Sequence, residues 1–186
     1  MKQIPVLIAL EEELPVELPQ PFVKIITGIG KVNAAIAIME TIYEYNPEAI
    51  INFGTAGSLN PKFGEGLYKI ASIAERDLDL RAIGFKLGQS SFDDPIWYNM
   101  TDTPGYLTLT SGDQFVQTYP EMKSDLVDME AAVYAKVCKK YDIKLSVFKF
   151  VTDNADDLSA EKWKERQHRG ASLFMKVLEN DINSKQ

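Results

Sequence analysis

The chain has 186 residues, 45% of them hydrophobic and 25% charged, which suits one globular domain with a substantial core. Its formal net charge of −7 argues against a nucleic-acid or anionic-membrane partner, because either would favour a basic surface. The single cysteine, Cys138, excludes an internal disulfide and fits a reducing cytoplasm. The single histidine, His168, lies in a polar run, so we discount a Ser-His-Asp triad and a multi-histidine metal site.

The first part of the chain alternates between short apolar runs and polar turns. Residues 4–10 are too few to cross a bilayer and predict a first strand, which ends in the acidic run at residues 11–13. The prolines that follow predict an extended connection rather than a helix. Residues 22–27 predict a second strand, and the helical spacing of apolar residues over 32–46 predicts a helix. Residues 49–53 predict a third strand.

The alternation of strands and helices continues to the end of the chain. Further predicted elements are strands over residues 67–74, 106–110 and 147–151, and helices over residues 128–141 and 159–180. The segment from residue 75 to 103 has a mixed pattern and is typical of a packed loop. This order predicts a single α/β domain over residues 1–186, a three-layer sandwich around a central, mostly parallel twisted sheet, with residues 182–186 as a disordered tail.

The strongest candidate for a functional residue is Asp153. It follows the apolar run Val147–Val151, which is interrupted only by Lys149 and reads as a buried strand. Ligands of open α/β sheets bind beyond the carboxyl ends of the strands, where Asp153 would be partly withdrawn from water and could hold or share a proton. An alternative stays open, in which Asp153 and Asn154 only cap the next helix.

Other strand ends also carry glycine or acid. The turn Gly28–Gly30 could bind an anion through backbone N–H groups or could be a plain tight turn. Gly54–Ser58 lacks the lysine of a phosphate-binding loop, so either a sugar or base approaches its bare backbone or it is a simple turn. Glu11–Glu13 would ordinarily be a solvated run, and the acids of Asp128–Glu130 also suit a helix start. Together, carboxylates without a usable histidine indicate acid–base chemistry, such as cleavage of a sugar C–N bond.

Seven motifs span nearly the whole chain: Ala9–Glu13, Thr27–Ala35, Ile50–Leu59, Arg76–Asp79 with Gly84-Phe85, Ser111–Val116, Asp128–Ala132 and Thr152–Asp156. In this order they resemble the purine-nucleoside/uridine phosphorylase superfamily, most closely its methylthioadenosine/S-adenosylhomocysteine nucleosidase branch. The resemblance implies a nucleoside-phosphorylase-like fold and a homodimer. It also implies a purine nucleosidase that hydrolyses the N-glycosidic bond of methylthioadenosine or S-adenosylhomocysteine, releasing adenine, with no metal or organic cofactor.

The resemblance also implies roles for individual residues. Asp153 would assist the departure of adenine at N7, and Glu13 would activate the attacking water. Glu130 would bind the ribose hydroxyls. The remaining implied contacts are Met129 along the sugar, Phe115 stacked on the base, the backbone of Val116 at the base edge, Thr55 near the water, Thr152 beside the base-side acid, Lys149 in support of the water site and Trp163 along the 5′ pocket.

The chain departs from the family pattern in ways that bear on its chemistry. Phosphorylases carry an arginine where this chain has Asn52, and the glutamates of the first loop repel phosphate, so water is the preferred acceptor. Lys149 replaces a usual arginine and loses its bidentate fork. Compared with the family pattern, a helix and hairpin between Glu13 and Phe22 and a helix between Gly88 and Leu107 are missing, which leaves the 5′ substituent open. The alternatives are a nucleosidase or phosphorylase for another purine nucleoside, or a catalytically weak nucleoside-binding module.

Overall fold

The computed structural model describes residues 2–91, 94–100, 105, 107–156 and 158–184. Its strands are β1 (Ile4–Ile8), β2 (Phe22–Ile26), β3 (Ala49–Ser58), β4 (Gly66–Lys69), β5 (Ser72–Glu75), β6 (Trp97–Asn99), β7 (Thr108–Ser111), β8 (Leu126–Asp128) and β9 (Lys144–Asp153). Its α-helices are α1 (Lys31–Tyr45), α2 (Ala131–Lys140), α3 (Ser159–Arg166) and α4 (Ala171–Ser184), with 3₁₀ helices η1 (Glu11–Glu13) and η2 (Arg81–Ile83). None of the described helices has the length and apolar character needed to cross a bilayer.

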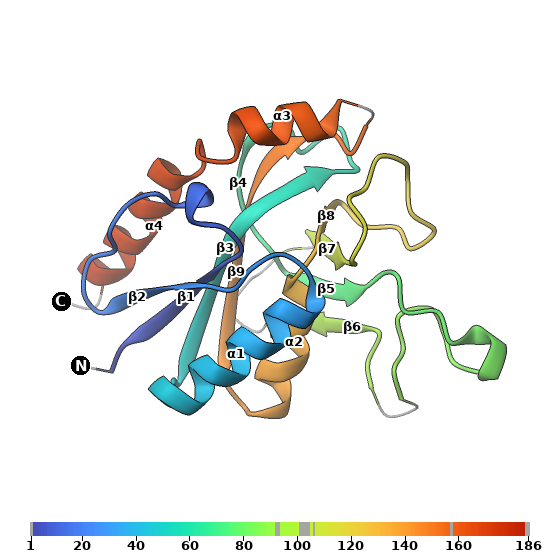
Figure 1. The fold of residues 1–186 in the computed structure, drawn as a ribbon, viewed down its shortest axis with the longest axis horizontal. Helices are drawn as coiled ribbons and strands as arrows, with labels where there is room; N and C mark the ends of the chain where they lie inside the picture. Colours follow the sequence, from blue (N-terminus) through green and yellow to red (C-terminus); the bar gives the residue numbers. More distant parts are fainter. Residues whose placement is uncertain (1, 92–93, 101–104, 106, 157, 185–186) are drawn as a thin grey trace.

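The described strands form one sheet between two helical layers (Figure 1). Along the sheet the order is β2-β1-β3-β8-β7-β5-β6, and β9 pairs with β3 and β4. The pairs β1–β2, β1–β3, β3–β9, β5–β7 and β7–β8 are parallel, and β3–β8, β4–β9 and β5–β6 are antiparallel. This arrangement confirms the predicted α/β class with a mostly parallel central sheet.

Two apolar cores hold the layers together. Ala34 and Ile38 of α1 and Tyr134 of α2 pack on one face of the sheet in the larger core. Phe174 and Leu178 of α4 pack on the other face, where the Phe174 ring stacks on Phe53 with centroids 4.3 Å apart. Burial of such side chains stabilises the fold by roughly 1.5–3 kcal/mol each. The central strand β3 is therefore covered on both faces and is held rigidly.

One edge of β3 pairs with two different strands, β1 along its first part and β8 along its last part. Val6 and Leu7 of β1 pair with Ile51 and Asn52, whereas β8 pairs with β3 only from Gly57 onward. Between these two pairings the strands β1 and β8 diverge (Figure 1). The intervening backbone of β3 is therefore available to other groups, and this is where the functional site lies.

Three sequence-based assignments of elements were wrong. Gly54–Ser58 is not a loop, because β3 continues through it in a ladder with β9. Residues 67–74 form two strands, since β4 pairs with β9 and β5 pairs with β7, while buried Ile70 and Ala71 between them extend the apolar pattern. Strands β6, within the predicted loop over residues 75–103, and β8 went unnoticed because three residues are too few to show a period.

The last predicted helix is also wrong in its extent. It is divided into α3 and α4, with Gly170 between them at the start of α4. A Cβ atom on Gly170 would lie 2.6 Å from Cβ of Phe150, so the chain turns there in close contact with β9. Helix α4 includes residues 182–184 of the expected tail, and residues 185 and 186 lie outside the described residues. The helix predicted from Asp128 begins at Ala131.

Candidate active site

A cavity of about 170 Å³ opens where the edge of β3 passes from β1 to β8. Nine of the ten predicted site residues line it: Glu13, Thr55, Phe115, Val116, Met129, Glu130, Lys149, Asp153 and Trp163. The tenth, Thr152, is buried behind the wall and donates its hydroxyl proton to Oδ2 of Asp153 at 2.7 Å. The fold thus brings together side chains that lie up to 150 positions apart in sequence, from Glu13 to Trp163.

Glu13 is not a solvated acid, because only 3% of its surface is exposed. It ends η1, directly after β1, and its carboxylate reaches the free edge of β3. Oε1 accepts hydrogen bonds from the backbone N and from Oγ1 of Thr55, both at 2.8 Å, and Oε2 accepts one from the backbone N of Leu10 at 3.2 Å. A Cβ on Gly54 would lie 3.3 Å from Nζ of Lys149 and 3.4 Å from Oε1 of Glu13, so both charged groups lie against this part of β3.

Asp153 ends β9 and is buried. Besides the hydroxyl of Thr152, the carboxylate accepts a hydrogen bond from the backbone N of Ala155 at 2.9 Å. A Cβ on Gly57 would lie 3.0 Å from Oδ1 of Asp153, so the neighbouring strand needs glycine at this position. The helix-capping alternative for Asp153 is wrong, because α3 begins only at Ser159 and follows Leu158 as its N-cap residue.

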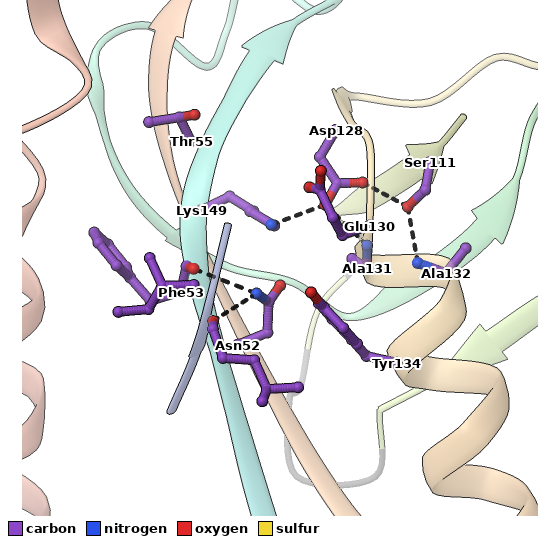
Figure 2. A network of polar contacts seen from close by, with 12 residues as sticks. Asn52, Phe53, Thr55, Ser111, Asp128, Glu130, Ala131, Ala132, Tyr134 and Lys149 are labelled. Carbon is purple, nitrogen blue, oxygen red and sulfur yellow. Dashed lines mark hydrogen bonds and ion pairs between the residues drawn. The ribbon is translucent and has the colours of Figure 1, made fainter. Parts of the chain in front are cut away.

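A buried ion pair lies at the centre of the cavity wall. Nζ of Lys149 is 2.8 Å from Oδ2 of Asp128, and both side chains are almost fully buried. Figure 2 shows Lys149 pointing from β9 toward Asp128, which also accepts a hydrogen bond from Ser111 at 2.5 Å. Burial alone would lower the pKa of Lys149, but the carboxylates of Asp128, Glu130 and Glu13 raise it, so the ammonium stays charged.

Glu130 combines burial with a carboxylate neighbour. Burial, followed by the charge of Asp128, raises the pKa of Glu130 to about 7. Its Oε1 accepts a hydrogen bond from the backbone N of Gly30 at 2.8 Å. The Gly28–Gly30 turn therefore binds an anion through its backbone, as one reading of the sequence predicted, but the anion is a carboxylate of this chain.

Phe115 and Trp163 form an aromatic wall. Their ring centroids are 6.5 Å apart and their planes are inclined by 73°. Phe115 remains 44% exposed, so packing of the chain does not account for it. Such a face suits a flat, apolar ligand group such as a heterocyclic base.

Sequence reasoning assigned no role to Arg76, which is buried and also lines the cavity. Its guanidinium donates to four backbone carbonyls, those of Thr110, Gly112, Gln114 and Asp128, at 2.7–3.1 Å. These bonds hold the loop that carries Phe115 beside the end of β8. Burial lowers the pKa of Arg76, although the neighbouring carboxylates oppose this. The only available signal was its place in one of the seven motifs.

An α/β sheet with buried carboxylates, a paired lysine and an aromatic wall around one cavity suits a small polar ligand that carries a flat ring. The sequence profile of the phosphorylase superfamily matches residues 19–99 and 100–182. The chain belongs to this superfamily, which confirms the family predicted from the motifs.

Similar proteins include nucleosidases. The chain is 30% identical to the 5′-methylthioadenosine/S-adenosylhomocysteine nucleosidase of Buchnera aphidicola subsp. Acyrthosiphon pisum. The alignment has 191 positions and covers 84% of this chain and 79% of that protein. It spans 64% of the length of the nucleosidase from Buchnera aphidicola subsp. Baizongia pistaciae, to which it is 29% identical.

Solved structures share the fold over almost their full length. A futalosine hydrolase of Helicobacter pylori superimposes with a TM-score of 0.87 at 21% identity, with 98% of each chain covered. The methylthioadenosine/S-adenosylhomocysteine nucleosidase of the same organism, in complex with a substituted pyrrolidin-3-ol, gives a TM-score of 0.86 at 22% identity, with 98% of each chain covered. The fold is therefore shared at low sequence identity.

Proposed function

We propose that this protein is a purine nucleosidase that hydrolyses the N-glycosidic bond of a 5′-substituted adenine nucleoside. The observation that carries the proposal is the placement of two buried carboxylates along β3. Glu13 is bonded at Thr55, and Asp153 contacts Gly57, two residues or roughly 7 Å further along the strand. A spacing of this order leaves room for a sugar carbon between a leaving base and an attacking water.

The reaction assigns opposite roles to these two acids. Protonated Asp153 gives its proton to N7 of the purine while the C1′–N9 bond breaks and its electron pair leaves with the base. Glu13 takes a proton from the water, whose oxygen forms the new bond to C1′. Glu130 accepts hydrogen bonds from the ribose hydroxyls beside Met129, and Phe115 stacks on the base. Transfer of the proton from Glu13 to solvent and reprotonation of Asp153 complete the cycle.

Water is a better acceptor than phosphate in this cavity. Its lining includes the carboxylates of Glu13 and Asp128, whose negative charges repel a phosphate anion. Among the described lining residues the two cations are already engaged, since Lys149 pairs with Asp128 and Arg76 donates to backbone carbonyls. A phosphate would have to break one of these arrangements.

The names of the relatives suggest the substrate, and one face of α1 suggests the assembly. We propose methylthioadenosine or S-adenosylhomocysteine as substrate, in a cytoplasmic homodimer. Helix α1 exposes Val32, Ile36, Met39 and Tyr43 at helical spacing, and Ile29 at its start is both exposed and part of the cavity lining. An exposed apolar stripe that reaches the mouth of the cavity suits contact with a second copy.

The test is release of free base from methylthioadenosine, S-adenosylhomocysteine, adenosine and inosine, with and without phosphate. Release without phosphate is expected, and Asp153→Asn and Glu13→Gln should each lower kcat at least 100-fold with modest change in binding. Asp156→Asn and Glu12→Gln are matched controls, because Asp156 pairs with Lys162 outside the cavity and Glu12 is exposed. Strict phosphate dependence would identify a phosphorylase instead, and binding without release would identify a binding module.

A further inference from the structure

Two consecutive hydrogen bonds link Trp163 of the aromatic wall to Glu13. Nε1 of Trp163 donates to Oγ1 of Thr55 at 2.9 Å, and the same Oγ1 donates to Oε1 of Glu13 at 2.8 Å. Trp163 belongs to α3, Thr55 to β3 and Glu13 to η1. A continuous chain of hydrogen bonds therefore connects three elements that meet at the cavity.

The chemistry of these groups fixes the direction of the chain. An indole N–H can only donate, an ionised carboxylate can only accept, and a hydroxyl has one proton and two lone pairs. The Thr55 hydroxyl therefore accepts a hydrogen bond from the Trp163 indole and donates one to the Glu13 carboxylate. A hydroxyl that accepts one hydrogen bond is polarised and becomes a better donor, so the indole strengthens the bond to the carboxylate.

This chain also makes the two oxygens of Glu13 unequal. Oε1 receives both the hydroxyl and the backbone N–H of Thr55, each at 2.8 Å, whereas Oε2 receives only the longer bond, 3.2 Å, from Leu10. The less saturated Oε2 is then the oxygen with a lone pair left to accept a proton from water. Without the hydrogen bond from the Thr55 hydroxyl, the carboxylate could rotate, and its two oxygens would no longer differ in their hydrogen bonds.

We propose that Trp163 is a positioning residue, which acts through its indole N–H on Thr55 to orient Glu13, in addition to serving as an aromatic wall. The inference deepens the proposed function and rests on it where kinetics are concerned. The two roles of Trp163 are separable, because Trp163→Phe keeps an aromatic ring beside Phe115 and removes only the N–H donor.

The kinetic test uses Trp163→Phe, Thr55→Val and the double variant. Trp163→Phe should lower kcat roughly 5- to 10-fold, the effect of one lost hydrogen bond, with KM within about twofold. If Trp163 acts through Thr55, the double variant should be no slower than Thr55→Val alone, and Thr55→Ser should retain most of the rate. An unchanged kcat for Trp163→Phe, or effects that multiply in the double variant, would overturn the proposal.

A spectroscopic test is independent of activity and separates failure of this inference from failure of the proposed function. The chain has two tryptophans, so the indole N–H proton resonance of Trp97 serves as an internal reference for that of Trp163. Thr55→Val and Glu13→Gln should both shift the Trp163 indole signal, whereas Glu12→Gln should leave it in place. If Glu13→Gln does not move that signal, the coupling does not exist, whether or not any nucleoside is hydrolysed.

Discussion

Replacing Glu130 with glutamine is expected to stabilise the free protein at pH 8 while it abolishes nucleoside binding. Burial and the nearby Asp128 raise the pKa of Glu130 from 4.5 to about 7. At about 1.4 kcal/mol for each pKa unit, an ionised Glu130 costs the folded protein roughly 3 kcal/mol above pH 7. Glutamine has no charge to bury, and its oxygen can still accept the hydrogen bond from Gly30.

The pH dependence of the free energy of unfolding fixes which of the two proteins is more stable. Between pH 4.5 and about 7 the unfolded chain has already lost the Glu130 proton while the folded protein keeps it, so wild-type stability falls as pH rises through this interval. Below it both states are protonated, and the wild type and Glu130→Gln should unfold with similar free energies. By pH 8 the variant should be more stable by up to about 3 kcal/mol.

Urea unfolding at a series of pH values measures the difference directly, and titration with a nucleoside measures the loss of binding. Glu12→Gln removes one exposed carboxylate from the same chain and controls for net charge. A difference between wild type and Glu130→Gln that does not depend on pH would refute the reasoning. So would a variant that is less stable than the wild type at pH 8.

Three further substitutions test the geometry. Lys149→Met should lower the free energy of unfolding by about 3–5 kcal/mol in urea, because it leaves the Asp128 carboxylate buried and unpaired, and adding Asp128→Asn should recover part of that loss. Gly57→Ala should lower kcat more than tenfold with little change in KM, because the added Cβ would lie 3.0 Å from Oδ1 of Asp153. Gly64→Ala is the control, since nothing lies within 4 Å of a Cβ at that position. An equal loss of kcat in Gly64→Ala would contradict this reasoning. Phe115→Ala should raise KM roughly tenfold through lost stacking on the base, while thermal unfolding stays unchanged because the ring is 44% exposed.

Sequence reasoning was strongest where a pattern was local and long. The periodicity of α1 and the apolar run before Asp153 both became the predicted elements, within a few residues at their ends. The motif order placed Glu13 and Glu130 in one site although single-sequence reasoning favoured a solvated run for the first and a helix start for the second. Burial by distant segments overrides the local reading of Glu13, since η1 turns back onto β3. Glu130 does stand at the start of α2 as its N-cap residue, and it also accepts a hydrogen bond from Gly30.

The features that sequence reasoning missed depend on partners in space. An apolar stretch over residues 67–74 contains no sign that β4 and β5 join different neighbours. Glycines at 54 and 57 look like turn residues, yet they lie within β3, where Nζ of Lys149 would be 3.3 Å from a Cβ on the first and Oδ1 of Asp153 would be 3.0 Å from a Cβ on the second. The Arg76 guanidinium donates hydrogen bonds to four backbone carbonyls, which lie in β7, in β8 and in the loop between them. No spacing in the sequence encodes these contacts.

Backbone geometry explains how one site can persist while its surroundings change. Each of its four carboxylates accepts at least one hydrogen bond from a backbone N–H: Glu13 from Leu10 and Thr55, Asp128 from Ala131, Glu130 from Gly30, and Asp153 from Ala155. These donors lie in β3, at the start of α1 and α2 and in the turns after β1 and β9, so the fold of the backbone places the acids. Side chains around them can then change without moving the acids, provided that the strands keep their order. Shortened loops away from β3 should therefore alter which nucleoside fits before they alter whether its glycosidic bond can be cleaved.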